Sequence, residues 1–257
     1  MTRQLTVCIL AALLMGAAFS SEQVQTLSPA QAALESARQN NKYVFIMFWK
    51  DNDPATQAVR QTLNSALAAQ SDKASSVLVR TKDSAEKPII DQYSVSRSPM
   101  PLVLAIAPNG AVTGGFSLKL TEQDVTGAIV SSGHAACIKA NQASKLVFLC
   151  VQPAGGTSEL PAGVTEFKAD PQYNQSTEIV VVRADDPAEA TFLKALAVNP
   201  RTTVVVSTLL APPRQLVATF EGAFTKEQAI EKLKAAQSGA CADGKCGPGG
   251  CKPAAVK

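Results

Sequence analysis

Hydrophobic and polar residues alternate in blocks along positions 28–135, and each block has the period of one secondary-structure element. Val44–Phe48 is an uninterrupted apolar run, as in a central strand that is buried on both faces. Asp53-Pro54 supplies an N-cap and a first helical proline, and apolar residues at helical spacing follow at Val59, Leu63 and Leu67. The other predicted elements are a helix from Ser28-Pro29 to about Arg38, a buried strand at Val77–Val79, a helix around Glu86–Gln92, a strand at Leu102–Ala107, a hairpin turn at Asn109-Gly110, a strand at Ala111–Phe116 and a helix that Thr121 caps.

The same pattern recurs at an offset of 103 residues, the separation of Lys42 and Lys145. The ungapped matches include charged positions: Val77–Arg80 with Val180–Arg183, Asp83 with Asp186, and Glu86 with Glu189. Such self-similarity predicts two domains of one type. In the second copy we expect strands at Ile179–Val182, Thr203–Ser207 and Gln215–Phe220, helices at Ala188–Leu196 and from Thr225 to about Ala235, and a turn at Pro212-Pro213.

Both copies follow the order β-α-β-α-β-β-α, which places parallel strands beside a C-terminal antiparallel hairpin. In the first copy, Phe48-Trp49 precedes Asp53-Pro54-Ala55-Thr56, and Tyr93-Ser94-Val95 leads to Pro99-Met100-Pro101. The first of these stretches resembles the thioredoxin family, in which Phe-Trp is followed by Cys-x-x-Cys at the start of a helix. The second resembles the family's cis-proline loop. Pro99 or Pro101 fits the cis position, and the distance to the hairpin turn favours Pro101.

The chain is therefore expected to be an α/β protein of two tandem thioredoxin-like domains, each with a central mixed sheet flanked by helices. We place a signal peptide at 1–20, the first domain at 26–140, a divergent second domain at 141–237 and a flexible Cys/Gly/Pro-rich tail at 238–257. Arg3, the short apolar run Leu5–Leu14 and the small-x-small site Ala18-Phe19-Ser20 are typical of a cleaved secretory signal. This predicts an extracytoplasmic protein, periplasmic or secreted, with no membrane span after cleavage.

The residues that perform thioredoxin chemistry are missing from both copies. The two thiol positions hold other residues: Asp53 and Thr56 in the first copy, Gly156 and Glu159 in the second. Dithiol exchange needs a thiolate at the helix N-terminus and a second thiol that resolves the mixed disulfide. Met47 stands at or near the position of the family's buried acid, and Val204 stands where the first copy has Pro101. The resemblance therefore implies the fold without conventional thioredoxin oxidoreductase activity.

The resemblance also concerns the family's peptide-binding groove, which is formed by residues other than the two thiols. In thioredoxins, the cis-proline loop and the helix N-terminus flank a shallow cleft that accepts an extended peptide. The resemblance implies that Trp49, Asp53, Met100 and Pro101 line such a cleft here. The alternative is that Trp49 and Met100 simply cover the edge of the core, because a fold does not carry its family's function with it.

Five cysteines remain after the signal peptide. Cys150 aligns with Met47 in a buried strand and is predicted to be a small core residue, while a disulfide with Cys137 is an open alternative. Cys241, Cys246 and Cys251 lie in a segment so rich in glycine and proline that we expect neither helix nor strand. Three thiolates there are suited to Cu(I) or Zn(II), or to disulfide exchange with one thiol left over.

Charge and histidine content exclude several classes of function. The 24 basic and 21 acidic residues nearly balance and the basic ones are scattered, which argues against nucleic acid as a partner. His134 is the only histidine and is expected to be a partly exposed surface residue, so hydrolase triads are not available. The oligomeric state cannot be predicted from these features.

Three functional hypotheses follow. The first is a non-catalytic protein-binding module that holds a polypeptide partner in the groove and needs no cofactor. The second is metal handling through Cys241, Cys246 and Cys251, and the third is thiol-disulfide exchange by the same cysteines.

Overall fold

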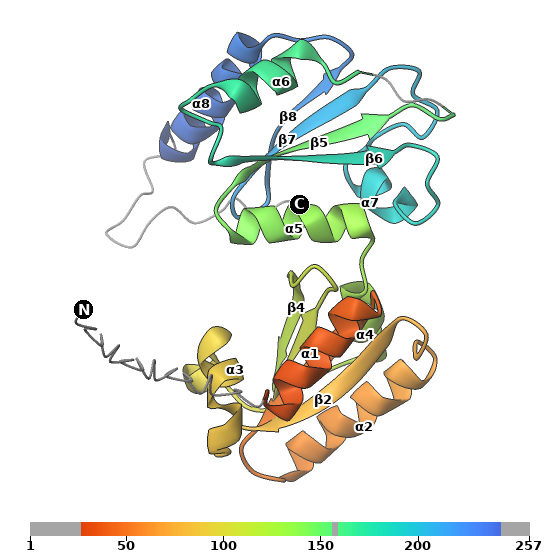
Figure 1. The fold of residues 1–257 in the computed structure, drawn as a ribbon, viewed down its shortest axis with the longest axis vertical. Helices are drawn as coiled ribbons and strands as arrows, with labels where there is room; N and C mark the ends of the chain where they lie inside the picture. Colours follow the sequence, from red (N-terminus) through yellow and green to blue (C-terminus); the bar gives the residue numbers. More distant parts are fainter. Residues whose placement is uncertain (1–26, 156–158, 243–257) are drawn as a thin grey trace, which may run out of the picture.

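The computed structural model describes residues 27–155 and 159–242, and the side chains up to Ser238. Within this part of the chain lie two four-stranded mixed sheets, each flanked by helices, which is the architecture of two tandem thioredoxin-like domains (Figure 1). The elements of the first domain are α1 (Pro29–Gln39), β1 (Tyr43–Trp49), α2 (Pro54–Ala68), β2 (Ala74–Arg80), α3 (Lys87–Gln92), β3 (Leu102–Ile106), β4 (Val112–Ser117) and α4 (Glu122–Ala128).

The elements of the second domain repeat this order. They are α5 (Ser132–Gln142), β5 (Leu146–Gln152), α6 (Ala162–Ala169), β6 (Thr177–Arg183), α7 (Ala190–Ala195), β7 (Val206–Ala211), β8 (Gln215–Glu221) and α8 (Lys226–Ala242). The strand orders are β2-β1-β3-β4 and β6-β5-β7-β8, and in each sheet the first pair is parallel and the other two are antiparallel. Even the irregularity of the hairpin recurs, at Ala105/Ile106 and at Leu209/Leu210.

Each sheet is covered on both faces. In the first domain, α1 and α3 bury one face of β1, including Ile46 and Phe48, while α2 and α4 bury the other, including Phe45 and Met47. The second domain has the same two layers, with α5 and α7 on one face and α6 and α8 on the other. The continuous apolar runs of β1 and β5 follow from this double burial.

Helix α5 packs on both domains. Its Cys137 and Ala140 belong to the core of the second sheet, whereas its Ala135 and Ile138 belong to the core formed with α2 and α4 of the first. Figure 1 shows α5 lying between the two sheets. A helix that is apolar on two sides is buried on both. The boundary expected between residues 140 and 141 falls inside α5, which begins 103 residues after α1 and contributes to both cores.

A buried glutamate anchors the first helix of each domain. Ser28 caps α1, and the carboxyl group of Glu86 accepts hydrogen bonds from Ser28 Oγ at 2.6 Å and from the N–H of Ala30 at 3.2 Å. Ser131 caps α5 in the same way, and Glu189 accepts from Ser131 Oγ and from the N–H of Gly133 at 2.7 Å. These bonds satisfy N–H groups that a helix leaves unpaired in its first turn. The sequence match of Glu86 with Glu189 thus has a structural cause.

Three expected elements differ from the observed ones. Val77–Val79 is not a buried strand, because β2 forms the edge of its sheet and Leu78 is 43% exposed. The strand expected at Thr203–Ser207 begins at Val206, since the second copy has one extra residue before it. Residues 238–242 continue α8, although we expected no helix from Ser238 onward. The Ala residues among them favour helix strongly enough to delay its end.

Candidate functional site

The N-terminus of α2 is the place where a thioredoxin holds its nucleophile. Asp53 caps the helix there, and its Oδ1 accepts a hydrogen bond from the N–H of Thr56 at 2.8 Å. Asp53 is exposed, and Thr56, in the first turn of α2, is buried. In a thioredoxin, the free N–H groups at this helix end lower the pKa of the nucleophilic thiol. Here the carboxylate of Asp53 accepts from one of these N–H groups, and neither Asp53 nor Thr56 has a thiol. Dithiol exchange cannot take place at this position.

The cis-proline loop lies next to this helix end. The Met100–Pro101 peptide bond is cis, as the sequence spacing favoured, and the carbonyl oxygen of Pro101 accepts from the N–H of Leu118 at 2.7 Å. Phe48 pairs with Leu102 across β1 and β3, so the antiparallel register places Trp49 beside Pro101. Trp49, Asp53 and Pro101 therefore meet at one end of the first sheet.

Met100 does not join them on the same face. Its side chain packs against the core beneath α1 and α3. Trp49 lies on the same face of β1 as Phe45 and Met47, because side chains two residues apart in a strand share a face. It therefore points toward α2, away from the face that Met100 covers. For Met100, covering the core is thus the observed role, and of the four expected groove residues Trp49, Asp53 and Pro101 remain near the same end of the sheet.

Two arginines that sequence reasoning missed complete this site. The guanidinium groups of Arg60, on α2, and Arg80, at the end of β2, each lie 5.4 Å from the centre of the Trp49 ring. Cation–π contacts of this kind contribute about 0.5–1 kcal/mol at exposed sites. Arg60 Nε is buried without a hydrogen-bond partner, and no ion pair involves either arginine among the described residues. The pairing of strands β1 and β2 could have identified Arg80, because Arg80 is the residue of β2 that pairs with Trp49.

An ion pair borders the site on its exposed side. Lys82 Nζ lies 2.9 Å from Asp51 Oδ1, and this hydrogen bond lowers the pKa of Asp51. Both side chains are more than half exposed, so the pair stabilises the loop after β1 only slightly. Its effect on the site is to neutralise Asp51, which leaves Arg60, Arg80 and the exposed carboxylate of Asp53 as the other charges of the site.

The second domain lacks this arrangement. Gln152 stands in place of Trp49, and the register of Val151 with Val206 makes Val205, not Val204, the counterpart of Pro101. Helix α6 begins at Ala162, so Glu159 lies before the helix rather than within its first turn, and Gly156 is outside the described residues. The second cis peptide of the described chain, Pro212–Pro213, is in the hairpin turn instead.

The two described cysteine side chains are buried, unreactive and separate. Cys137 lies on α5 and faces the second sheet. Cys150 faces the opposite side of that sheet, where its Sγ lies 3.8 Å from Ser207 Oγ. Both thiols are free, so the open alternative of a disulfide between them is not realised. Burial raises the pKa of Cys137 to about 12 and that of Cys150 to about 11, which leaves almost no thiolate at neutral pH.

The remaining candidate residues from the sequence do not form a catalytic or metal-binding cluster in the described part of the chain. His134 stacks on Phe192 with ring centres 4.2 Å apart, and burial lowers its pKa. Residues 27–155 and 159–242 contain no group of three or more potential metal ligands. Cys241 lies in the last turn of α8, where side chains are not described, and Cys246 and Cys251 lie outside the described residues. No helix of the described chain is long and apolar enough to cross a membrane.

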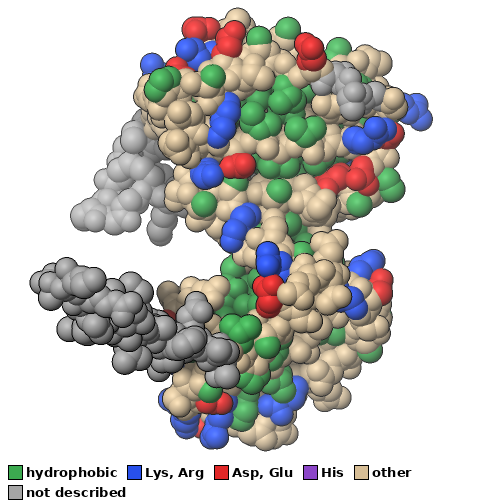
Figure 2. Space-filling model, in the orientation of Figure 1, with side chains coloured by type: hydrophobic (Ala, Val, Ile, Leu, Met, Phe, Trp, Pro, Cys, Tyr) green, Lys and Arg blue, Asp and Glu red, His purple; other side chains and the backbone are tan. Residues whose placement is uncertain are grey.

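Surface charge is mixed on the face drawn in Figure 2, where basic and acidic side chains are interspersed over both domains. This face carries no continuous basic area of the kind that nucleic acid requires.

No protein-family model and no curated protein matches the chain. The first two thioredoxin domains of Saccharomyces cerevisiae Eps1p are similar over 81% of this chain and 96% of that one, at 10% identity and a TM-score of 0.30. The N-terminal domain of alkylhydroperoxide reductase AhpF from Enterococcus faecalis is similar over 77% and 98%, at 18% identity and 0.30. The disulphide isomerase from Xylella fastidiosa Temecula1 is similar over 37% and 82%, at 17% identity and 0.30.

These similarities concern the fold alone. At such identities and TM-scores they carry no conclusion about activity or partners. The thioredoxin-like character of both domains follows from their order of elements and their shared strand order.

Proposed function

We propose that this protein is a non-catalytic thioredoxin-like binding protein, which holds a polypeptide at the end of the first sheet. One observation carries the proposal. The first domain keeps an aromatic residue, a helix N-terminus and a cis-proline loop together, while Asp53 stands where the nucleophile would be. The second domain has lost the aromatic residue and the proline of this arrangement, so the scaffold does not require them.

The chemistry of the site suits a peptide. Trp49 offers a flat apolar surface, and Trp and Arg are the residue types that most often dominate the energy of interfaces. Arg60 and Arg80 hold the ring in place and present N–H donors that are free of carboxylate partners in the described chain. A groove of this composition binds backbone carbonyls and acidic side chains of an extended segment, and it performs no covalent step.

The test is a binding measurement on the mature protein. Peptides selected from a displayed random library are labelled with fluorescein, and their dissociation constants are measured by anisotropy. Trp49→Ala is expected to weaken binding at least tenfold, which corresponds to about 1.4 kcal/mol. Arg80→Gln is expected to weaken it severalfold. Arg183→Gln changes the matching position of the second domain and serves as the control, with no effect expected.

Two results would contradict the proposal. One is peptide binding that Trp49→Ala leaves unchanged. The other is insulin-disulfide reductase activity that survives deletion of residues 239–257, because no thiol in the remaining chain is then accessible by the geometry described above.

The protein's location and the tail cysteines belong to the same proposal. We expect export by the predicted signal peptide at 1–20, which places the groove where extracytoplasmic polypeptides are available. Metal handling and thiol exchange by Cys241, Cys246 and Cys251 stay predictions, and no observation in the described chain favours either of them over binding.

A further inference from the structure

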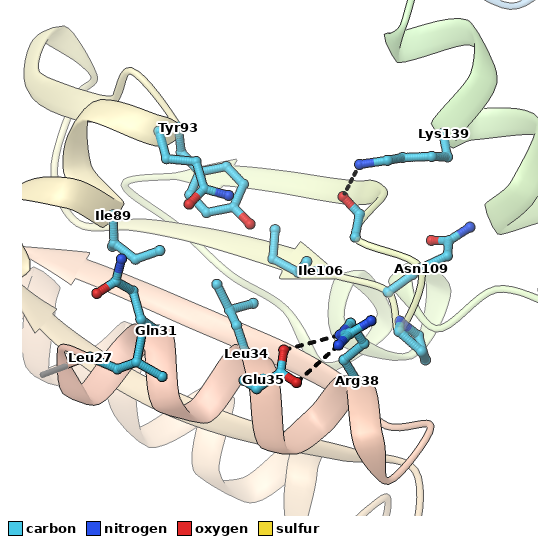
Figure 3. A pocket seen from close by; sticks show the side chains of 14 residues that line it. Leu27, Gln31, Leu34, Glu35, Arg38, Ile89, Tyr93, Ile106, Asn109 and Lys139 are labelled. Atoms are coloured by element: carbon cyan, nitrogen blue, oxygen red, sulfur yellow. Dashed lines mark hydrogen bonds and ion pairs between the residues drawn. The ribbon is translucent and has the colours of Figure 1, made fainter. Parts of the chain in front are cut away.

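The first domain has a hollow that Trp49 does not line. It is a cleft of about 520 Å³ between α1, α3, the β3–β4 turn and Lys139 of α5 (Figure 3). The helices that form its walls, α1 and α3, cover one face of the sheet. Trp49 and α2 lie on the other face. The volume is within the range of about 300–1,000 Å³ that is usual for small-molecule sites. The peptide site proposed above does not use this cleft.

The floor of the cleft is apolar. Ile89 and Ile106 are core residues, and Leu34 and Tyr93 pack against them while keeping part of their surface exposed. Leu27, which is 57% exposed, extends this surface at the start of α1. Ile89 and Ile106 are 0% and 2% exposed, so an apolar ligand would remove hydrophobic surface from water mainly at Leu27, Leu34 and Tyr93. Removing such surface from water is the main driving force for binding apolar molecules.

Charge gathers at the other end of α1. Arg38 donates to both carboxylate oxygens of Glu35, from Nε and from an Nη, at 3.0 Å each. Lys139 Nζ donates to the carbonyl oxygen of Gly110 at 3.2 Å and has no carboxylate partner among the described residues. Figure 3 shows both cations at the end where Asn109 lies. Two cations and one carboxylate leave one positive charge there.

The cleft is therefore polarised along its length. Gln31 and Arg38 lie on the lining face of α1, and seven residues of helix separate them by about 10 Å. Ile89 and Leu27 lie near the Gln31 end, and the net positive charge lies near the Arg38 end (Figure 3). A complementary ligand is long, apolar along most of its length and anionic at one terminus.

We propose that this cleft binds a single-chain aliphatic carboxylate of the fatty-acid type, with its chain on Leu27, Leu34 and Tyr93 and its carboxylate between Lys139 and Arg38. The pairing is charge-assisted and sits at the mouth of an apolar surface. Because Lys139 belongs to α5, the bound carboxylate also links the first helix of the second domain to the first domain.

The experiment measures calorimetric binding of decanoate to the mature protein, below the concentration at which it forms micelles. Decanoate is expected to bind, while decyltrimethylammonium, which has the same chain length and the opposite charge, is expected not to bind. Lys139→Gln is expected to weaken decanoate about tenfold, and Lys73→Gln, an exposed lysine away from the cleft, is expected to have no effect. Glu35→Gln removes the only carboxylate at the charged end and is expected to tighten binding severalfold.

A second variant tests the floor. Leu34→Asn is expected to weaken decanoate by tenfold or more while an unchanged melting temperature shows that the domain is folded. Equal binding of the ammonium probe would overturn the proposal, as would an unchanged affinity in Lys139→Gln. Failure of decanoate to bind would also overturn it, and binding of an acetylated peptide that ends in leucine would then identify a peptide as the occupant.

Discussion

The two domains share their scaffold and differ at their sites. Both have the same strand order, the same hairpin bulge and the same buried glutamate at the start of their first helix. Only the first has an aromatic residue at the end of its central strand and a cis-proline beside it. What recurs is therefore what the fold needs, and what occurs once is a candidate for function.

The glutamates illustrate the first half of this comparison. Glu86 and Glu189 are 3% and 2% exposed, yet a carboxyl group is costly to bury unless it is hydrogen-bonded. Each one accepts from a serine hydroxyl and from a backbone N–H at a helix N-terminus, where the helix dipole favours an acceptor of negative charge. These hydrogen bonds fasten α1 to the segment that leads into α3, and α5 to the segment that leads into α7.

The largest effect is expected from removing these glutamates. Glu189→Ala leaves the N–H of Gly133 and the hydroxyl of Ser131 without their acceptor, and we expect a loss of about 3 kcal/mol in the free energy of unfolding. Glu86→Ala is expected to have a similar effect on the first domain alone. The measurement is urea unfolding, followed by the fluorescence of Trp49, the only tryptophan, and by circular dichroism.

The two variants also test the role of α5. Since Ala135 and Ile138 of α5 belong to the core of the first domain, Glu189→Ala should lower the midpoint of the Trp49 signal as well. An unchanged Trp49 midpoint in Glu189→Ala would show that α5 does not stabilise the first domain. Glu189→Gln keeps one acceptor oxygen and is expected to lose less.

A smaller effect is expected where the two anchors differ. Gly133 stands where the first domain has Ala30, and a Cβ at Gly133 would clash with Val182 Cγ1 and lie 2.9 Å from both carboxylate oxygens of Glu189. Gly133→Ala is therefore expected to destabilise the second domain by about 2 kcal/mol, measured by urea unfolding.

Gly127→Ala is the matched control for that variant. Gly127 lies in α4, and a Cβ there meets nothing within 4 Å. The substitution is expected to stabilise the first domain by about 0.5–1 kcal/mol, through helix propensity alone. Equal effects of the two substitutions would mean that the packing around Gly133 and Glu189 is looser than the distances indicate.

An effect that is absent at neutral pH distinguishes the second domain by its two buried thiols. Unfolded Cys137 and Cys150 lose their protons near pH 9, whereas burial raises their folded pKa values to about 12 and about 11. Unfolding therefore releases protons in this window. The thiols' contribution to stability is complete below pH 9 and is lost as pH rises toward 11–12. Tyr43, whose pKa burial raises to about 12, adds a similar loss in the first domain only above pH 10.

The measurement is the slope of the unfolding free energy against pH between 8.5 and 10.5. The double variant Cys137→Ala/Cys150→Ala is expected to flatten this slope, whatever its stability at neutral pH. A slope that matches the wild type would show that the two thiols ionise in the folded protein as readily as in the unfolded chain.

Local patterns in the sequence predicted most of the fold. The apolar run of β1, the cap of α2 at Asp53, the cis bond before Pro101 and the repeat of Glu86 in Glu189 are all confirmed. Such features depend on residues close together in the chain, or on the period of one element. The absence of thiols at Asp53 and Thr56 was visible in the same way.

The places where prediction failed all depend on contacts between distant segments. Two apolar sides on one helix do not reveal which sheet each side packs against, and only the structure shows that α5 contributes to both cores. The edge position of β2, the separation of Met100 from Trp49 by the sheet, and the cleft that ends at Lys139 follow only when strands pair and helices pack. Composition and periodicity determine which elements form and what chemistry they can carry. Which side chains meet is decided by tertiary packing, because neighbours in space are set by the register and layers of the whole sheet.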